Sequence, residues 1–217
     1  MRHNVLLILV LLVVPALLFS QINWTEHIIS GTFDFPYSVF AIDLDDDGDI
    51  DVLGAASNAD DITWWENDGD ENFTEHTIAG SFDGANSVFA IDVEPDGDID
   101  VLGAASTADD ITWWENDGDE NFTEHTIAGS FDGAISVFAI DLDDDNDIDV
   151  LGTANIADDV TWWENDGNEN FTEHTIEGNF DGARSVYAID MEPDGDVDVL
   201  ASAYFADDIA WWENDGN

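Results

Sequence analysis

The sequence has no cysteine, no lysine and only two arginines, so its 52 acidic residues leave a formal net charge of −50. An exported protein without cysteine must be held together without disulfides. Binding to nucleic acid or anionic lipid depends on Lys and Arg side chains that neutralise phosphate. The composition therefore predicts that neither nucleic acid nor an anionic membrane surface is a partner.

Recognisable catalytic motifs are also missing. The sequence contains no His-Glu-x-x-His, no Gly-x-Ser-x-Gly and no phosphate-binding loop. Paired carboxylates can cleave glycosides, but the pairs in this chain fall in a repeated loop that suits a metal ion. The sequence predicts a protein that is not an enzyme, with an enzyme or its substrate-targeting module as the alternative.

The first twenty residues have the pattern of a secretory signal peptide. Arg2 and His3 precede an apolar run over residues 5–19, and the small residue Ser20 follows it. Because the run is too short to span a bilayer comfortably, we expect cleavage between Ser20 and Gln21, with an uncleaved anchor as the alternative. Residues 21–217 are then one secreted or cell-surface domain, with no membrane insertion after cleavage.

The rest of the chain consists of four copies of one unit. The pair Trp64-Trp65 returns three times at intervals of 49 residues, and the segment Asn-Phe-Thr-Glu-His recurs with the same spacing. Nine Trp and thirteen Phe supply the apolar surface for a folded core, which argues against disorder. The units cover residues 23–71, 72–120, 121–169 and 170–217.

Each unit contains four short stretches rich in Val, Ile, Phe, Trp and Thr, separated by Asp, Asn and Gly. In the second unit these stretches cover residues 73–78, 87–91, 100–105 and 110–115. Four short strands in a unit of this length fit one blade of a β-propeller. We therefore predict an all-β fold, a β-propeller of four four-stranded blades.

The repeat unit does not begin where a blade begins: each unit starts with the segment that forms the fourth strand of a blade. Residues 24–29 correspond to the fourth strand of a blade, and residues 209–214 correspond to a third strand. Pairing of these two segments would complete one blade, close the ring and leave no sheet edge open. The alternative is that the chain is a fragment of a larger propeller.

One acidic stretch recurs in every unit. In residues 43–53, DLDDDGDIDVL, carboxylates occupy positions 1, 3, 5, 7 and 9 counted from Asp43, and Gly48 occupies position 6. Alternate residues of a tightly turning loop point inward, and Ca²⁺ takes six to eight oxygen ligands. Glycine at position 6 permits a positive φ. We therefore expect about one structural Ca²⁺ per blade.

The loop is repeated in all four units, with Asn146 in place of the glycine in the third unit. Asparagine is one of the few residues that adopt the left-handed conformation readily. The predicted metal ligands are Asp43, Asp45, Asp47, Asp49, Asp51, Asp92, Glu94, Asp96, Asp98, Asp100, Asp141, Asp143, Asp145, Asp147, Asp149, Asp190, Glu192, Asp194, Asp196 and Asp198.

An EF-hand does not fit this loop, because position 12 is Gly or Ala in every unit, where an EF-hand needs a bidentate Glu. The loop runs directly into a predicted strand, which indicates that it bridges a β-hairpin. A solvated acidic face is the alternative, although such a face would not keep position-specific spacing.

The segment SVFAIDLDDDGDIDVL, residues 38–53, resembles the FG-GAP or VCBS-type repeat of integrin α-chain propellers and many secreted bacterial proteins. The resemblance covers essentially residues 23–217 and implies a β-propeller with calcium in the first hairpin of each blade. It also implies side-chain ligands at positions 1, 3, 5 and 9 and a main-chain carbonyl at position 7. Units two and four have Glu-Pro at positions 3 and 4, where the longer Glu is expected to weaken binding.

The aromatic pair and one histidine per unit are given structural roles. Trp64 and Trp65 are adjacent in a strand and face opposite ways, so we expect both rings to be buried between blades, with a sugar-stacking Trp as the alternative. The histidines are expected on a packed or channel-facing surface and not in a metal site. They are His27, His76, His125 and His174.

These observations predict a secreted, calcium-binding β-propeller that acts as a binding or adhesion module for an extracellular protein or glycan. A lectin-like carbohydrate-binding propeller is the alternative. The fold alone does not identify the ligand.

Overall fold

The computed structural model describes residues 22–216, and the regular secondary structure in this range is β-strand. Among these residues, no helix is long and apolar enough to cross a membrane. The predicted signal peptide, residues 1–20, lies outside the described residues, and so does its cleavage site after Ser20.

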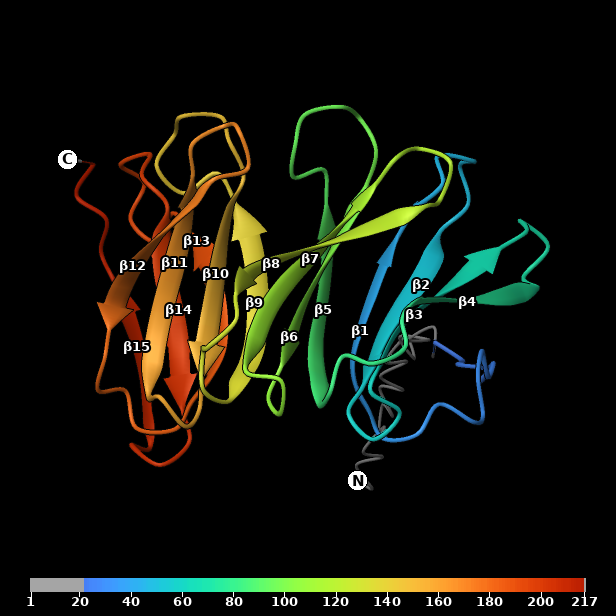
Figure 1. Cartoon of the computed structure of the whole chain (residues 1–217), viewed down its shortest axis with the longest axis horizontal. Coiled ribbons are helices and arrows are strands. Elements are labelled where there is room, and N and C mark those ends of the chain that lie inside the picture. Colours follow the sequence, from blue (N-terminus) through green and yellow to red (C-terminus); the bar gives the residue numbers. More distant parts are fainter. Residues whose placement is uncertain (1–21, 217) are drawn as a thin grey trace, which may run out of the picture.

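Four antiparallel sheets follow one another along the chain (Figure 1). Each sheet takes its first three strands from one repeat unit, and the first three sheets take their fourth strand from the next unit. We call the sheets blades one to four. Blade one contains β1 (Pro36–Ile42), β2 (Asp51–Ala56), β3 (Asp61–Asn67) and β4 (Phe73–Ala79). Blade two contains β5 (Ala85–Ile91), β6 (Asp100–Ala105), β7 (Asp110–Asn116) and β8 (Phe122–Ala128). Blade three contains β9 (Ala134–Ile140), β10 (Asp149–Ala154), β11 (Asp159–Asn165) and β12 (Phe171–Glu177). Blade four contains β13 (Ala183–Ile189), β14 (Asp198–Ala203) and β15 (Asp208–Trp212).

The predicted all-β, blade-by-blade fold is confirmed. In the second unit the structure has strands over the four stretches that the sequence indicates, with ends that differ by at most two residues. The strands pair in sequence order, so the acidic stretch connects the first two strands of every blade. The strand segments are apolar and rich in β-branched residues, which favours this pairing.

Neighbouring blades pack through their first strands, which we call inner strands. Phe40, Phe89, Phe138 and Tyr187 lie on the four inner strands and form a ladder with ring centroids 4.8–4.9 Å apart. A hydrogen bond accompanies each step of the ladder, and in the first step the Val88 N–H donates to the Ser38 Oγ over 3.3 Å. The same ring contact and the same hydrogen bond therefore recur at each interface between neighbouring blades.

In blades one to three, both tryptophans of each pair pack against other side chains, on opposite faces of the blade. Trp64 stacks on His76, whereas Trp65 forms a T-shaped contact with Phe33. Gly54 makes room for this contact, because a Cβ at that position would lie 2.9 Å from both Phe33 and Trp65. The expected burial of both rings is confirmed in blades one and two, where each ring is at most 5% exposed. In blade four the expected burial of both rings is wrong, because Trp211 on the edge strand β15 is 43% exposed.

The predicted closure of the ring is not formed. Residues 22–35 contain no strand, and blade four has three strands, with β15 at its edge. The two ends of the described chain lie at opposite ends of the row of blades (Figure 1). Strand formation depends on a partner backbone more than on local propensity, and no strand of the described chain lies beside residues 24–29.

Candidate metal centres

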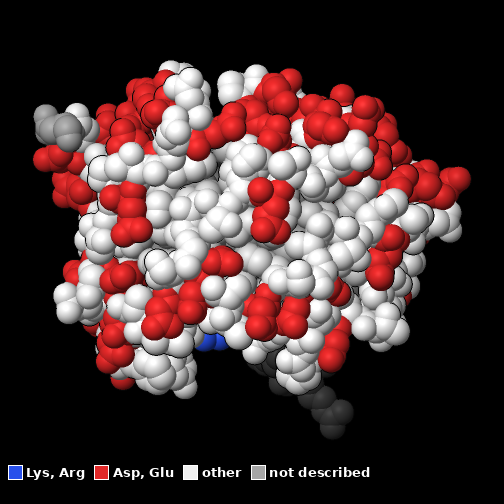
Figure 2. All heavy atoms as spheres, in the orientation of Figure 1, with Lys and Arg blue, Asp and Glu red and all other residues white. Residues whose placement is uncertain are grey.

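The acidic loops gather on one rim of the molecule. They follow the inner strands of the four blades, and Figure 2 shows acidic side chains concentrated along this rim, at the top of the view. The loops cover residues 43–50, 92–99, 141–148 and 190–197.

Position 6 of each loop has the backbone conformation that the sequence predicts. The φ angle is 97° at Gly48, 103° at Gly97 and 105° at Gly195. Asn146 replaces glycine in the third loop and adopts a φ of 75°. The predicted left-handed turn is therefore confirmed in all four loops.

The carboxylate at position 9 connects three parts of each blade. Asp51 is fully buried. Its Oδ2 accepts the Leu44 N–H over 3.0 Å, and its Oδ1 accepts the Asn67 N–H over 2.8 Å. Because Leu44 is in the acidic loop and Asn67 ends the third strand, one side chain fixes the loop to the sheet. The same two bonds are made by Asp100, Asp149 and Asp198.

Asn67 belongs to the site although it is not among the residues predicted from the sequence. Its Nδ2 donates to the Ile50 carbonyl over 3.1 Å, and its Oδ1 accepts the Gly69 N–H over 3.2 Å. The signal in the sequence was the motif Trp-Trp-Glu-Asn-Asp-Gly, which recurs in every unit. The equivalent residues are Asn116, Asn165 and Asn214.

Carboxylates from positions 1, 3 and 9 converge in blades one and three. Asp43, Asp45 and Asp51 each offer an oxygen, and these oxygens all lie within 4.8 Å of one another. Asp141, Asp143 and Asp149 form the same arrangement in blade three. Three oxygens at this separation can bind one cation.

These two clusters pass a test of fit for a cation. Within residues 22–216, the buried Oδ1 atoms of Asp43 and Asp141 have no hydrogen-bond partner. A buried carboxylate oxygen without a donor is costly, and a hard cation with oxygen ligands supplies the missing partner. The donor set is therefore suited to Ca²⁺.

Blades two and four have a different loop. Within the described residues, no cluster of three carboxylates forms there. In blade two the Glu94 carboxyl lies against Asp100, and its buried Oε2 has no partner among residues 22–216. The backbone differs too. In blade one, Asp46 at position 4 has a φ of 57°, whereas blade two has Pro95 at this position, and the proline ring does not allow a positive φ.

Burial raises the pKa of the clustered carboxyl groups. Burial is the main cause for Asp149, whose pKa rises to about 7 although two backbone N–H groups oppose the shift and nearby acids add to it. Burial likewise raises the pKa of Asp51 and Asp45. In blade two, burial raises the pKa of both Glu94 and Asp100. Repulsion from Asp100 adds to the shift of Glu94, whereas the hydrogen bond with Glu94 lowers the pKa of Asp100. A bound cation would reverse these shifts, because it favours the ionised form.

Positions 5 and 7 lie outside the three-carboxylate clusters. The Asp47 Oδ1 accepts the Asp49 N–H over 2.8 Å. The Asp49 carboxylate lies against Gly69 in the neighbouring loop, where a Cβ would overlap it. The side chain at position 7 thus faces away from the cluster, while the roles of positions 5 and 7 as metal ligands stay predictions.

The repeated histidines lie on the fourth strand of their blades and not in a shared centre. His76 stacks on Trp64 with centroids 4.7 Å apart, and its Nε2 lies 2.9 Å from the Glu66 Oε2. His125 and His174 repeat this arrangement. The expected packed position is therefore confirmed for these three residues, on the outer strand of each blade. For His27 the expectation is wrong, because this residue is exposed and does not lie in a strand.

Comparison with known proteins bears on both the loops and the fold. The FG-GAP-like repeat family matches residues 43–103, 92–152 and 141–201, which together span more than half of the chain. Comparison with curated proteins gives no match.

Solved structures share the architecture at low sequence identity. An endo-arabinase from Bacteroides thetaiotaomicron is 14% identical with a TM-score of 0.54, and the match covers 88% of this chain and 81% of that one. A Lactobacillus plantarum protein is 15% identical (TM-score 0.48; coverage 82% and 54%), and the Vibrio cholerae biofilm matrix protein Bap1 is 18% identical (TM-score 0.46; coverage 82% and 30%). The chain thus spans about half and about a third of the latter two proteins. The arabinase similarity supports the fold alone.

Proposed function

Because the chain belongs to the FG-GAP-like repeat family, we propose that it is a secreted β-propeller module that binds Ca²⁺ in its acidic hairpins. The observation that supports this most directly is the cluster of Asp43, Asp45 and Asp51, with its buried and unpartnered Asp43 Oδ1. The equivalent residues of blade three form the second site. Blades two and four bind more weakly, since their Glu-Pro loops do not bring three carboxylates together.

Calcium has a structural role in this proposal. It relieves repulsion among carboxylates that are tied to the sheet through Asp51 and its equivalents. Extracellular calcium modules bind with dissociation constants of about 10⁻⁴ to 10⁻³ M. A site whose own dissociation constant is exceeded tenfold stabilises the fold by about 1.4 kcal/mol, so all four sites filled to that extent contribute about 5–6 kcal/mol.

The test is thermal unfolding of the full chain with Ca²⁺, with Mg²⁺ and with chelator. We expect Ca²⁺ to raise the melting temperature by about 10–20 °C over the chelated protein, at about 2–4 °C per kcal/mol, and Mg²⁺ to have a much smaller effect. A melting temperature that does not respond to chelator contradicts the proposal.

Matched variants locate the effect. Asp43→Asn combined with Asp141→Asn removes one ligand from each three-carboxylate cluster, so at least half of the calcium-dependent rise in melting temperature should disappear. Asp70→Asn removes one negative charge from an exposed loop position and should leave that rise unchanged. Equal losses in both proteins would indicate a general effect of charge.

We propose that ligand recognition takes place on the opposite rim, where the repeats differ. The residue pair before each Ala-Asp-Asp is Ser-Asn, Ser-Thr, Asn-Ile or Tyr-Phe, although the flanking residues are nearly identical in the four units. Tyr204 and Phe205 are 67% and 66% exposed there, and they line a cavity of about 590 Å³ with Arg184. Exposed aromatic side chains beside a cation suit a glycan or an extracellular protein. This rim gives the chain a non-catalytic binding or adhesion role.

A glycan array distinguishes the two ligand classes. Binding to one class of sugar that is lost in Tyr204→Ala and kept in Ile156→Ala supports a lectin-like module. Ile156 is the matched control because it occupies the position in blade three that corresponds to Phe205 and is 63% exposed. An array without any binding favours a protein ligand on the same rim.

A further inference from the structure

The fourth strand of each complete blade, which we call the outer strand, contributes to the core between blades. Phe122 begins β8 and packs against the core that blades one and two share, which includes Trp64. Phe171 begins β12 and takes the same place between blades two and three. In these two places the outer strand therefore covers the first Trp of the preceding blade.

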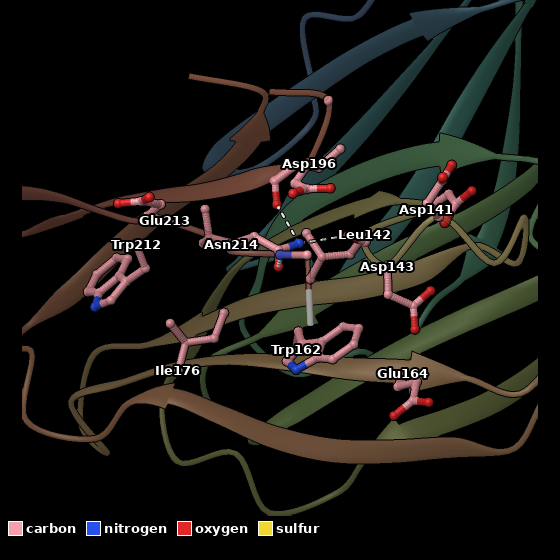
Figure 3. Close-up of a pocket in the computed structure, with 15 residues that line it drawn as sticks. Asp141, Leu142, Asp143, Trp162, Glu164, Ile176, Asp196, Trp212, Glu213 and Asn214 are labelled. Carbon is pink, nitrogen blue, oxygen red and sulfur yellow. Dashed lines mark hydrogen bonds between the residues drawn. The ribbon is translucent and has the colours of Figure 1, made fainter. Parts of the chain in front are cut away.

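The corresponding space between blades three and four is a cavity of about 670 Å³. Trp162, Ile176 and Trp212 point into it (Figure 3). Trp162 is only partly buried, whereas its equivalents Trp64 and Trp113 are each 1% exposed. The cavity is where an outer strand paired to β15 would place its first aromatic side chain.

Residues 22–29 have the sequence of an outer strand. Their sequence Ile-Asn-Trp-Thr-Glu-His-Ile-Ile matches Glu-Asn-Phe-Thr-Glu-His-Thr-Ile at residues 71–78, with Trp24 in place of Phe73. In the structure this segment is not a strand, and Trp24 is 87% exposed. Within residues 22–216, the strand-like segment 22–29 therefore has no pairing strand, and the outer edge of β15 has none either.

The next residues along the chain fix the position of this segment. Phe33 packs on Trp65 of blade one, as Phe82 packs on Trp114 of blade two. The segment that precedes Phe82 is β4, the outer strand of the previous blade. By the same relation, residues 24–29 are the outer strand of a blade that would pack against β1. Only three residues separate Ile29 from Phe33, so the segment cannot reach far from blade one. The chain's own blade four lies at the other end of the row (Figure 1).

We propose that a second copy of this chain docks head to tail, so that residues 22–29 of one copy pair with β15 of the other. Trp24 fills the cavity beside Trp162 and Trp212. The register follows from the pairs Trp64↔His76 and Glu66↔Thr74 in blade one, so that Trp211 lies opposite His27 and Glu213 opposite Thr25.

Other contacts of the blade interface are available at the two ends. Tyr187 is the last ring of the inner-strand ladder and is 51% exposed, whereas Phe40 is the first ring. Ser185 corresponds to Ser136, whose Oγ accepts the Val186 N–H over 3.4 Å, so in the proposed assembly Ser185 accepts the Val39 N–H. Both surfaces continue an interface that the molecule already forms between its own blades.

Disulfide cross-linking tests the register, since the chain has no cysteine of its own. Full-length Thr25→Cys and Glu213→Cys are mixed and oxidised in the presence of Ca²⁺, and we expect a mixed-disulfide dimer. The matched control mixes Thr74→Cys with Glu213→Cys, because Thr74 is already paired with Glu66, and should give no more cross-linking than either variant alone. A mixture that cross-links no better than the control overturns the proposal.

The double variant Thr25→Cys/Glu213→Cys tells a second copy from closure within one chain. Docking of a second copy gives covalent dimers or longer chains, whereas an internally cross-linked monomer at all concentrations contradicts the proposal. In sedimentation, the unmodified chain should associate, and Trp24→Ala should weaken the association about tenfold or more. Ile156→Ala, an exposed apolar residue away from both surfaces, should not change it, and equal weakening in the two variants would also overturn the proposal.

Discussion

At the scale of single residues, the aspartate at position 9 is subject to two opposing influences. Its hydrogen bonds favour the ionised carboxylate, whereas its burial and the neighbouring acids disfavour it. Asp149 accepts two backbone N–H groups, from Leu142 and Asn165, and so holds the loop on the sheet. The same burial raises its pKa to about 7, and nearby carboxylates that repel its charge add to the shift. The cation proposed at positions 1, 3 and 9 would offset the repulsion and so favour the ionised form as well.

The first prediction concerns this connection. Asp149→Ala leaves the N–H groups of Leu142 and Asn165 without their acceptors, which costs about 1–3 kcal/mol for each buried donor. We expect the free energy of unfolding in chelator at pH 6 to fall by about 2–4 kcal/mol, measured by urea denaturation. Asp70→Ala changes an exposed aspartate and should alter the free energy of unfolding by less than about 0.5 kcal/mol. Equal losses in the two proteins would show that the two N–H bonds contribute little.

The second prediction concerns pH in the absence of calcium. A carboxyl group whose pKa is higher in the folded than in the unfolded chain favours the folded state at low pH, and this advantage is lost as the pH rises through the folded pKa. For Asp149 the window runs from the ordinary value of 3.8 to about 7. In chelator, the melting temperature should therefore fall as the pH rises from about 5 to about 7.

Calcium should reverse this trend, because it binds the ionised carboxylates. Hydrogen bonds lower the pKa of the exposed residues Asp68, Asp117 and Asp166. Their contribution has the opposite sign, but it is lost only below about pH 4, outside the window measured. A chelated protein that becomes more stable between pH 5 and 7 would contradict the assignment.

At the scale of elements, the chain contains two kinds of hairpin loop. The Asp-Asp loops of blades one and three place position 4 at a positive φ and gather three carboxylates. In the Glu-Pro loop of blade two, the Asp96 N–H instead bonds the Glu94 carbonyl over 2.6 Å. Blade four repeats that bond at Asp194 and Glu192. The two loop sequences, which alternate from blade to blade, therefore also differ in backbone conformation.

The third prediction exchanges the loops. Glu94→Asp combined with Pro95→Asp gives blade two the sequence of blade one at positions 3 and 4. We expect the calcium affinity of this site to rise about tenfold, measured by calorimetry, because ligand number and loop rigidity set the affinity of such loops. The reverse exchange in blade three, Asp143→Glu with Asp144→Pro, should lower it by a similar factor. An unchanged binding isotherm in both variants would mean that the two loop types are equivalent.

The strands and the acidic loops could be predicted from the sequence because both depend on local patterns. Exact spacing defined the blades, and Gly48 and Asn146 marked the left-handed turn. The unpaired state of residues 24–29 could not be predicted, since it depends on which strand lies beside them. The role of Asn67 was also missed, because its partners Asp51 and Ile50 are distant in sequence and meet it only after the hairpin has folded.

At the scale of the whole molecule, net charge opposes folding even when every site is filled. Four Ca²⁺ ions change the formal charge from −50 to −42. A compact chain with this charge is destabilised by its own repulsion. Acidic atoms line the top rim in Figure 2 and form separate patches over the rest of the face, so the repulsion acts across blades as well as within loops. The salt concentration should therefore influence stability independently of the metal sites.

The fourth prediction separates these two effects. In chelator, an increase in NaCl from about 0.01 to 0.15 M shortens the Debye length from about 30 to 8 Å, which weakens repulsion between blades more than repulsion within one loop. We expect the melting temperature to rise by several degrees, and choline chloride to act like NaCl because screening does not depend on the identity of the cation. At fixed ionic strength, added Ca²⁺ should raise the melting temperature further, in proportion to the occupancy of the metal sites. If NaCl stabilised the chelated protein and choline chloride did not, sodium would be binding in the loops, and screening would not be the cause.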